Sequence, residues 1–293
     1  CAKNLVDSEY LITGLKHVGY KINPNVSDSD VAIINTCGFL DIAREESIDK
    51  IVEIDELKQQ GVIDKIIVMG CLSERYGDEL QKELPNIDKF FGSEEHEAVI
   101  KYLSGKSFNL DDPDIIRASL TPKHYSYLKI AEGCDNACSF CSIPLMRGLQ
   151  KSQPLRWNVE EAKRLASRGV KELLVIAQDS TSYGWDANPK TSLNELFSEL
   201  YKIDGLEWLR LHYAHRSNLH REMIKKFVNI NFTFTKVIKN FLPGPFTILI
   251  ENNKFSEFIA DVAPILEFYS ATMLSLIHIS EPTRRYAIAY AVV

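Results

Sequence analysis

Several features are missing from this sequence, and each absence excludes a class of protein. No stretch approaches about 18 consecutive apolar residues, so no membrane-spanning helix and no membrane partner are expected. No signal peptide opens the chain, which favours a cytoplasmic protein. Basic residues are not in excess, because the net charge is −6. That balance does not indicate a nucleic-acid substrate, although it leaves room for a local basic patch.

The 293 residues, 45% of them hydrophobic, suffice for two ordinary domains. Because the chain begins with Cys and not with Met, we expect further residues to precede it. Without a secretion signal, its six cysteines are expected to be reduced and not joined in disulfides. They fall into two groups of three, with none left over. The compact group is Cys134, Cys138 and Cys141. The dispersed group is Cys1, Cys37 and Cys71.

The compact group has the spacing C-x3-C-x2-C. Three thiolates so close together can hold three irons of a cubane cluster and leave the fourth iron open to a molecule that carries an amine and a carboxylate. A zinc site and a pair of buried thiols are the alternatives. Structural zinc almost always takes four ligands, and no fourth Cys or His lies close in sequence. The spacing therefore favours an iron–sulfur cluster over zinc.

The dispersed group is predicted to meet at one edge of a sheet. Residues 30–36 and 64–70 are short apolar runs typical of buried parallel strands, and Cys37 and Cys71 directly follow them. The carboxyl ends of parallel strands share an edge at which ligands bind. Cys1 heads a predicted loop that runs into a helix, as expected after a third strand. The alternative is three free thiols in the core.

The expected fold class is α/β: an open parallel sheet domain at residues 1–105, a linker at 106–124 and a partial β/α barrel at 125–220. An atypical tail follows at 221–293. The other elements predicted in the first domain are helices at 7–19, 43–60 and 73–84 and a short strand at 89–92. Those predicted in the barrel are strands at 125–130, 171–177 and 207–213 and helices at 159–168 and 191–203. The compact cysteines follow the first barrel strand, on the face where such barrels carry catalytic loops.

Residues 133–141 resemble the cysteine motif of the radical S-adenosylmethionine (SAM) superfamily. The segments around the dispersed cysteines resemble the N-terminal domain of the methylthiotransferases: Cys1-Ala2-Lys3-Asn4, Asn35-Thr36-Cys37-Gly38-Phe39 and Met69-Gly70-Cys71-Leu72. The Ala-Lys-Asn after the first Cys is most similar to the branch that methylthiolates an aspartate of small-subunit ribosomal protein twelve. The tRNA-modifying branch usually has Gln-Met-Asn there. The resemblance extends to about Asn218.

The resemblance implies two four-iron–four-sulfur (4Fe–4S) clusters. The compact cysteines would bind the cluster that cleaves SAM to a 5′-deoxyadenosyl radical, with an electron from a donor such as a flavodoxin or ferredoxin. The dispersed cysteines would bind an auxiliary cluster that helps to deliver sulfur. The substrate would be the aspartyl β-carbon of the ribosomal protein. Three rival functions stay open: a tRNA methylthiotransferase, a non-catalytic electron-transfer protein with two clusters, and a structural zinc protein.

Four residues are candidate contacts of SAM. Phe140 precedes the last cysteine, where the superfamily usually has an aromatic residue beside the adenine. Arg147 could face an anionic cluster or the SAM carboxylate, and the alternative is a solvated surface residue. Gln178 and Asp179 follow the second barrel strand, and capping of the next turn is the alternative role for both.

The resemblance stops in the tail. Residues 237–250 resemble a segment of the threonylcarbamoyl-adenylate synthase family, and residues 274–284 resemble the translation of a sequencing adapter. We therefore interpret the tail after about residue 220 as chimeric and draw no function from it.

Overall fold

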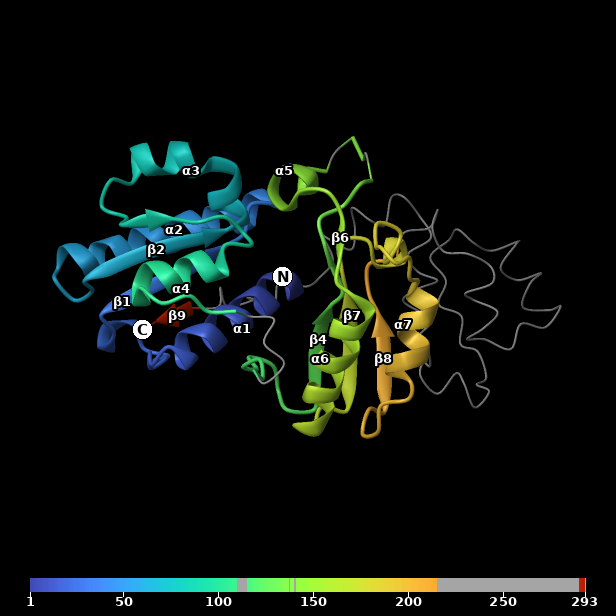
Figure 1. Ribbon diagram of the computed structural model, residues 1–293. Coiled ribbons are helices and arrows are strands. Elements are labelled where there is room, and N and C mark those ends of the chain that lie inside the picture. Colours follow the sequence, from blue (N-terminus) through green and yellow to red (C-terminus); the bar gives the residue numbers. More distant parts are fainter. Residues whose placement is uncertain (110–114, 137, 140, 215–289, 293) are drawn as a thin grey trace. The chain divides into compact units, whose positions relative to one another are not determined.

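The computed structural model describes residues 1–109, 115–136, 138–139, 141–214 and 290–292 (Figure 1). They fall into two compact units. Of the described residues, the first unit comprises those within 1–120, 133–149 and 290–292, and the second comprises those within 121–132 and 150–214. Within the described residues, no helix has the length and apolar character needed to cross a membrane.

The first unit is built on a sheet with the strand order β3-β2-β1-β9, in which the first three strands are parallel and β9 is antiparallel. The strands are β1 Val31–Thr36, β2 Lys65–Gly70, β3 Lys89–Phe90 and β9 Tyr290–Val292. All of β1 is buried, which is why it reads as an apolar run. The helical segments are α1 Ala2–His17, η1 Val26–Asp28, α2 Asp41–Gln59, α3 Cys71–Glu83, α4 His96–Ser104 and α5 Ile143–Arg147.

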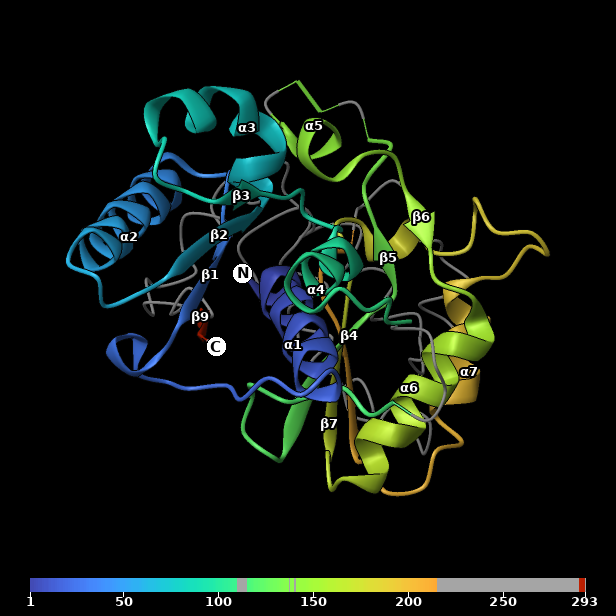
Figure 2. The same ribbon diagram turned by 60° about the vertical axis from the view of Figure 1, so that its left-hand side comes forward.

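Side chains of β1 alternate between two hydrophobic cores, one on each face of the sheet. Ile33 packs in a cluster with Leu15 of α1 and Ile100 of α4. Its neighbour Ile34 packs in the other cluster, with Ile54 of α2. Figure 2 shows α1 and α4 on one face of the sheet and α2 on the other. The two-residue period of the strand therefore matches helices on both faces, as in an open α/β sheet.

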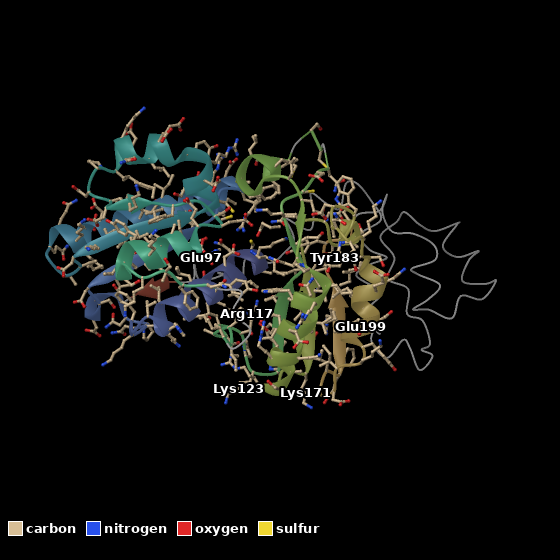
Figure 3. All side chains as sticks on the ribbon, viewed as in Figure 1. Glu97, Arg117, Lys123, Lys171, Tyr183 and Glu199 are labelled. Carbon is tan, nitrogen blue, oxygen red and sulfur yellow. The ribbon has the colours of Figure 1, made fainter. Side chains whose placement is uncertain are left out.

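The end of the predicted linker is attached to α1. Arg117, labelled in Figure 3, lies with its Nε 3.2 Å from Glu9 Oε2, and both side chains are almost fully buried. The other Glu9 oxygen accepts a hydrogen bond from the Leu120 amide at 2.7 Å, and Thr13 Oγ1 accepts one from the Ala118 amide at 2.7 Å. Residues up to Leu120 are thereby held in the first unit.

The second unit contains a parallel three-stranded sheet with the order β4-β7-β8. Its strands are β4 Tyr125–Lys129, β7 Glu172–Ile176 and β8 Trp208–Leu211. Between them come α6 Leu155–Ser167, η2 Ser180–Ser182 and α7 Leu193–Leu200, and a short antiparallel ladder joins β5 Ala131–Glu132 to β6 Lys151–Ser152. Leu128, Val175 and Leu209 of the strands pack with Leu165 and Leu196 of the helices. Repeated strand–helix–strand units in chain order are the arrangement predicted for a partial β/α barrel.

The predicted α/β fold class is confirmed, and the predicted strands agree with the structure to within two residues at each end. The helices differ more: α1 begins five residues before its predicted start, and α4 was not predicted. The segment after the compact cysteines contains the short helix α5, which was not predicted. The two-residue strands β5 and β6 are too short to carry a period that a sequence could reveal. The predicted domain boundaries stay predictions, and residues 215–289 of the tail lie outside the described residues.

Candidate functional site

Two of the dispersed cysteines directly follow neighbouring strands of the first unit, at the same edge of the sheet. Thr36 lies opposite Gly70 in the parallel ladder, and Cys37 and Cys71 come directly after them. An added Cβ at Gly38 would lie 2.7 Å from the carbonyl oxygen of Cys71, so the two connections approach too closely for a side chain there. The prediction that these two cysteines share the carboxyl edge of parallel strands is confirmed.

The third dispersed cysteine, Cys1, occupies the N-cap position of α1 and is exposed. Asn4 Nδ2 donates to the carbonyl oxygens of Asn35 at 3.3 Å and Thr36 at 3.4 Å. Asn35 Nδ2 donates in return to the Asn4 carbonyl oxygen at 3.1 Å. These bonds attach the first turn of α1 to the end of β1. The loop predicted after Cys1 is therefore wrong, because this attachment holds the segment in helical form from Ala2 onward.

Arg147 lies beside Cys71 and is buried, so its alternative interpretation as a solvated surface residue is wrong. Its Nε donates to Cys71 Sγ at 3.0 Å, and its Nη1 donates to Asp7 Oδ2 at 2.7 Å. Burial raises the pKa of the Cys71 thiol, while the positive charge of Arg147 acts in the opposite direction and nearby Cys37 adds to the rise. A cation thus faces the thiol that would be negative as a metal ligand.

The compact cysteines lie in the segment Gly133–Leu149, which belongs to the first unit. Cys134 is buried, and its amide donates to the Gly148 carbonyl oxygen at 3.1 Å. The Cys141 amide donates to the Cys138 carbonyl oxygen at 3.1 Å, so these two residues share a turn. Burial raises the pKa of the Cys141 thiol, and neighbouring Cys138 raises it further. Phe140 lies outside the described residues.

Neither group of three cysteines is arranged as a complete set of metal ligands. Among the residues that the structure describes, no three Cys, His, Asp or Glu side chains form an arrangement that could hold a metal ion. The predicted ligation by both groups therefore stays a prediction.

The residues nevertheless fit an iron–sulfur cluster chemically, because thiolates are the usual cluster ligands and each group has three. Backbone close to the thiols admits no side chain: a Cβ at Gly70 would lie 2.5 Å from the Asn35 side-chain oxygen, and one at Gly133 would lie 2.1 Å from the Leu149 carbonyl oxygen. Both glycines also have positive φ, of 106° and 71°. In both groups, the thiols thus lie near glycine backbone that is packed too closely for a side chain.

Gln178 lies in the second unit beside a buried ion pair that the sequence analysis missed. Its Nε2 donates to Glu132 Oε1 at 2.5 Å, and Lys129 Nζ donates to Glu132 Oε2 at 2.7 Å. Both charged side chains of the pair are buried. The signal that could have revealed them is two opposite charges three residues apart at the end of an otherwise apolar strand.

Asp179 caps the turn η2. Its Oδ1 accepts hydrogen bonds from the Thr181 amide at 3.0 Å and the Thr181 hydroxyl at 2.5 Å, and its Oδ2 accepts one from the Ser182 hydroxyl at 2.6 Å. These are the contacts of the capping alternative. A role for Gln178 or Asp179 in binding SAM stays a prediction.

Known proteins are similar to this chain over much of its length. Residues 1–92 match the model of a family described as "Uncharacterized protein family UPF0004". The chain is 45% identical over 239 residues to ribosomal protein uS12 methylthiotransferase RimO of Symbiobacterium thermophilum. This match covers 78% of this chain and 49% of that protein. It is 50% identical over 216 residues to the RimO of Christiangramia forsetii. That match covers 73% of this chain and 47% of that protein.

Among solved structures, the chain is similar to the cobalamin-dependent SAM radical enzyme OxsB. The TM-score is 0.45 and the sequence identity 13%, over 70% of this chain and 35% of that one, which is too weak to support an inference.

The chain spans about half the length of the curated relatives it matches. Its matched part carries all three dispersed cysteines within residues 1–92. The chain thus carries that domain at residues 1–92, and over about three quarters of its own length it is 45–50% identical to proteins named ribosomal protein uS12 methylthiotransferase.

Proposed function

We propose that this chain acts as a radical-SAM methylthiotransferase that replaces a hydrogen on the β-carbon of an aspartate in ribosomal protein uS12 with a methylthio group. The observation that carries the proposal is the contact of 3.0 Å between Arg147 Nε and Cys71 Sγ. Arg147 lies six residues past Cys141, so this contact joins the segment of the compact cysteines to a dispersed cysteine. A link between the segments of the two cysteine groups supports a reaction in which one group would supply a radical and the other sulfur.

In this proposal Cys134, Cys138 and Cys141 hold one 4Fe–4S cluster. Cys1, Cys37 and Cys71 hold the auxiliary cluster. When bound, the clusters and SAM supply the radical and the sulfur, which no side chain can generate. One SAM would be the source of the methyl group and a second the source of the radical, and the substrate hydrogen would leave with 5′-deoxyadenosine. A flavodoxin or ferredoxin supplies the electron.

The protein's own residues position these groups. Gln178 and the buried Glu132 are hydrogen-bonded to each other past the carboxyl end of the second sheet, the end at which β/α barrels bind their ligands. Phe140 is proposed to contact the adenine of SAM, as the resemblance of its motif implies. uS12 is proposed as the substrate because the relatives at 45–50% identity carry its name.

The test is an anaerobic reconstitution of the protein with iron and sulfide, followed by SAM, a reductant and purified uS12. The expected products are 5′-deoxyadenosine and a uS12 peptide whose aspartate carries one methylthio group by mass spectrometry. Cys134→Ala is expected to abolish both products. Cys37→Ala is expected to abolish the methylthio product and retain 5′-deoxyadenosine.

The rival functions give other results. Modification of tRNA and not of uS12 would indicate the tRNA-modifying branch. Full iron without any 5′-deoxyadenosine would indicate an electron-transfer protein, and bound zinc without iron a structural zinc protein.

A further inference from the structure

The Arg147 guanidinium contacts a carboxylate and a thiol in a buried place. The ion pair with Asp7 measures 2.7 Å, and the side chains of Arg147 and Asp7 are 2% and 1% exposed. A different nitrogen of the same group, Nε, faces Cys71 Sγ at 3.0 Å. The two edges of the planar group are thus directed at two different acidic partners, which a lysine ammonium could not reproduce.

The three partners come from three segments that each carry a predicted cluster ligand. Asp7 lies six residues after Cys1 on α1, and Cys71 begins α3. Arg147 ends α5, six residues after Cys141. One side chain therefore connects the segments of both cysteine groups.

The residues on either side of Arg147 hold the same segment in place. The Met146 carbonyl oxygen accepts a hydrogen bond from the Ser93 hydroxyl at 3.1 Å. The Gly148 carbonyl oxygen accepts one from the Cys134 amide at 3.1 Å. Arg147 thus sits in a segment that is fixed to the first unit on one side and to the first compact cysteine on the other.

We propose that Arg147 is a positioning residue that holds the segment of the compact cysteines against the dispersed group through Asp7 and Cys71, and that it is not a ligand of SAM. This inference rests on the proposed function and narrows the role predicted for Arg147 from the sequence. Its charge acts on the cluster that Cys71 would hold, because a cation that donates a hydrogen bond to a ligand sulfur stabilises the more reduced, more negative state of a cluster.

The decisive variant is Arg147→Met, which keeps the length of the side chain and removes its charge. We expect the midpoint potential of the auxiliary cluster, measured by an EPR-monitored redox titration, to become more negative, and that of the compact cluster to stay unchanged. Methylthiolation of uS12 should fall about 10- to 100-fold, the range for outer-shell partners of metal ligands. Formation of 5′-deoxyadenosine and the KM for SAM should stay near the wild-type values.

Arg147→Lys and Asp7→Asn are the milder variants, and they carry the test if circular dichroism shows that Arg147→Met is unfolded. Arg147→Lys should retain the potential of the auxiliary cluster and lose part of the methylthiolation, because it keeps the charge without the two-edged contact. The control is Lys58→Met, which removes another cation–carboxylate contact of the first unit, the 2.6 Å pair with Asp88, and should change none of these values.

The inference is overturned if Arg147→Met leaves the potential of the auxiliary cluster and the ratio of methylthio product to 5′-deoxyadenosine unchanged. It is also overturned if the KM for SAM rises while the auxiliary potential stays constant, since that result assigns Arg147 to SAM. A wild-type protein that forms no 5′-deoxyadenosine contradicts the proposed function instead. The auxiliary potential still tests the contact with Cys71 in that case.

Discussion

At the scale of residues, buried cations in both units lie beside carboxylates. Arg147 pairs with Asp7 in the first unit, and Lys129 pairs with Glu132 in the second, each at 2.7 Å. The free energy of such a pair is small when it is intact, but removal of one partner leaves an uncompensated buried charge. These positions should therefore be sensitive to substitutions that surface pairs tolerate.

Lys129→Met should lower the free energy of unfolding by about 3–5 kcal/mol, because Glu132 would keep its charge in a buried place without its cation. The measurement is urea denaturation of the purified protein. The matched control is Lys163→Met, which removes the exposed pair with Glu160, whose side chains are 54% and 47% exposed. That change should cost less than about 1 kcal/mol. Equal losses in the two variants would contradict this account.

Tyr183 makes the stability of the second unit depend on pH. Burial raises the pKa of Tyr183 from 10 to about 12, while its hydroxyl donates to the Gln153 carbonyl oxygen at 2.8 Å and accepts from Asn158 Nδ2 at 3.0 Å. The folded state favours the neutral phenol. The contribution of Tyr183 to the free energy of unfolding is therefore complete below pH 10 and is lost as the pH rises toward about 12.

Tyr183→Phe should reduce the free energy of unfolding by about 1–2 kcal/mol at neutral pH, since it removes both hydrogen bonds of the hydroxyl. The variant should also lack the contribution of Tyr183 to the decline in the free energy of unfolding between pH 10 and 12. Chemical denaturation at a series of pH values measures both effects. An identical slope in wild type and variant over that interval would show that another group causes the decline.

At the scale of elements, the connection after β1 must pass very close to the start of α3. Gly38 is the position where this matters, since a Cβ there would meet three backbone atoms of Cys71 and Leu72 at 2.7–2.9 Å. Backbone atoms at a helix start cannot move aside as a flexible side chain could. The geometry of the shared edge thus depends on the absence of one methyl group.

Gly38→Ala should lower the free energy of unfolding by about 1–3 kcal/mol through overpacking and should reduce iron bound after reconstitution by displacing Cys71. Gly77→Ala in α3 is the matched control, because a Cβ at Gly77 meets nothing within 4 Å. It should be neutral or stabilise the protein by up to about 1 kcal/mol. Thermal unfolding and an iron assay compare the two, and wild-type iron content in Gly38→Ala would count against the predicted cluster at this edge.

At the scale of the whole molecule, the chain leaves the second unit after Glu132 and returns to it at Gln150. The segment between, which carries the compact cysteines, belongs to the first unit together with the dispersed ones. Both predicted clusters thus depend on the same compact unit for their ligands, although the sequence motif of one of them follows a strand of the other unit.

The reconstituted protein should bind about eight irons, as two four-iron clusters would require. Cys71→Ala should remove about half of them, and Cys138→Ala the other half, because each change opens one ligand set of three. Iron and sulfide analysis with EPR of the remaining cluster makes the measurement. Loss of all iron in either single variant would mean that the two sites do not form independently.

Much of the fold was predictable because its elements carry strong local patterns. The apolar runs that form β1, β2 and β7 are typical of buried strands, and Cys37 and Cys71 directly follow two of them. The short elements were not predictable. The five residues of α5 and the two-residue strands β5 and β6 depend on contacts with distant segments and carry no period of their own.

By itself, the sequence determined the α/β class, the two groups of three cysteines and the resemblance to the methylthiotransferases, because spacing and strand patterns are local properties. Only the tertiary structure decided that Arg147 is buried between Asp7 and Cys71 and that Glu132 joins Lys129 to Gln178. These contacts link residues up to 140 positions apart. Burial and pairing of charges depend on which distant segments the fold brings together, and no local pattern records that.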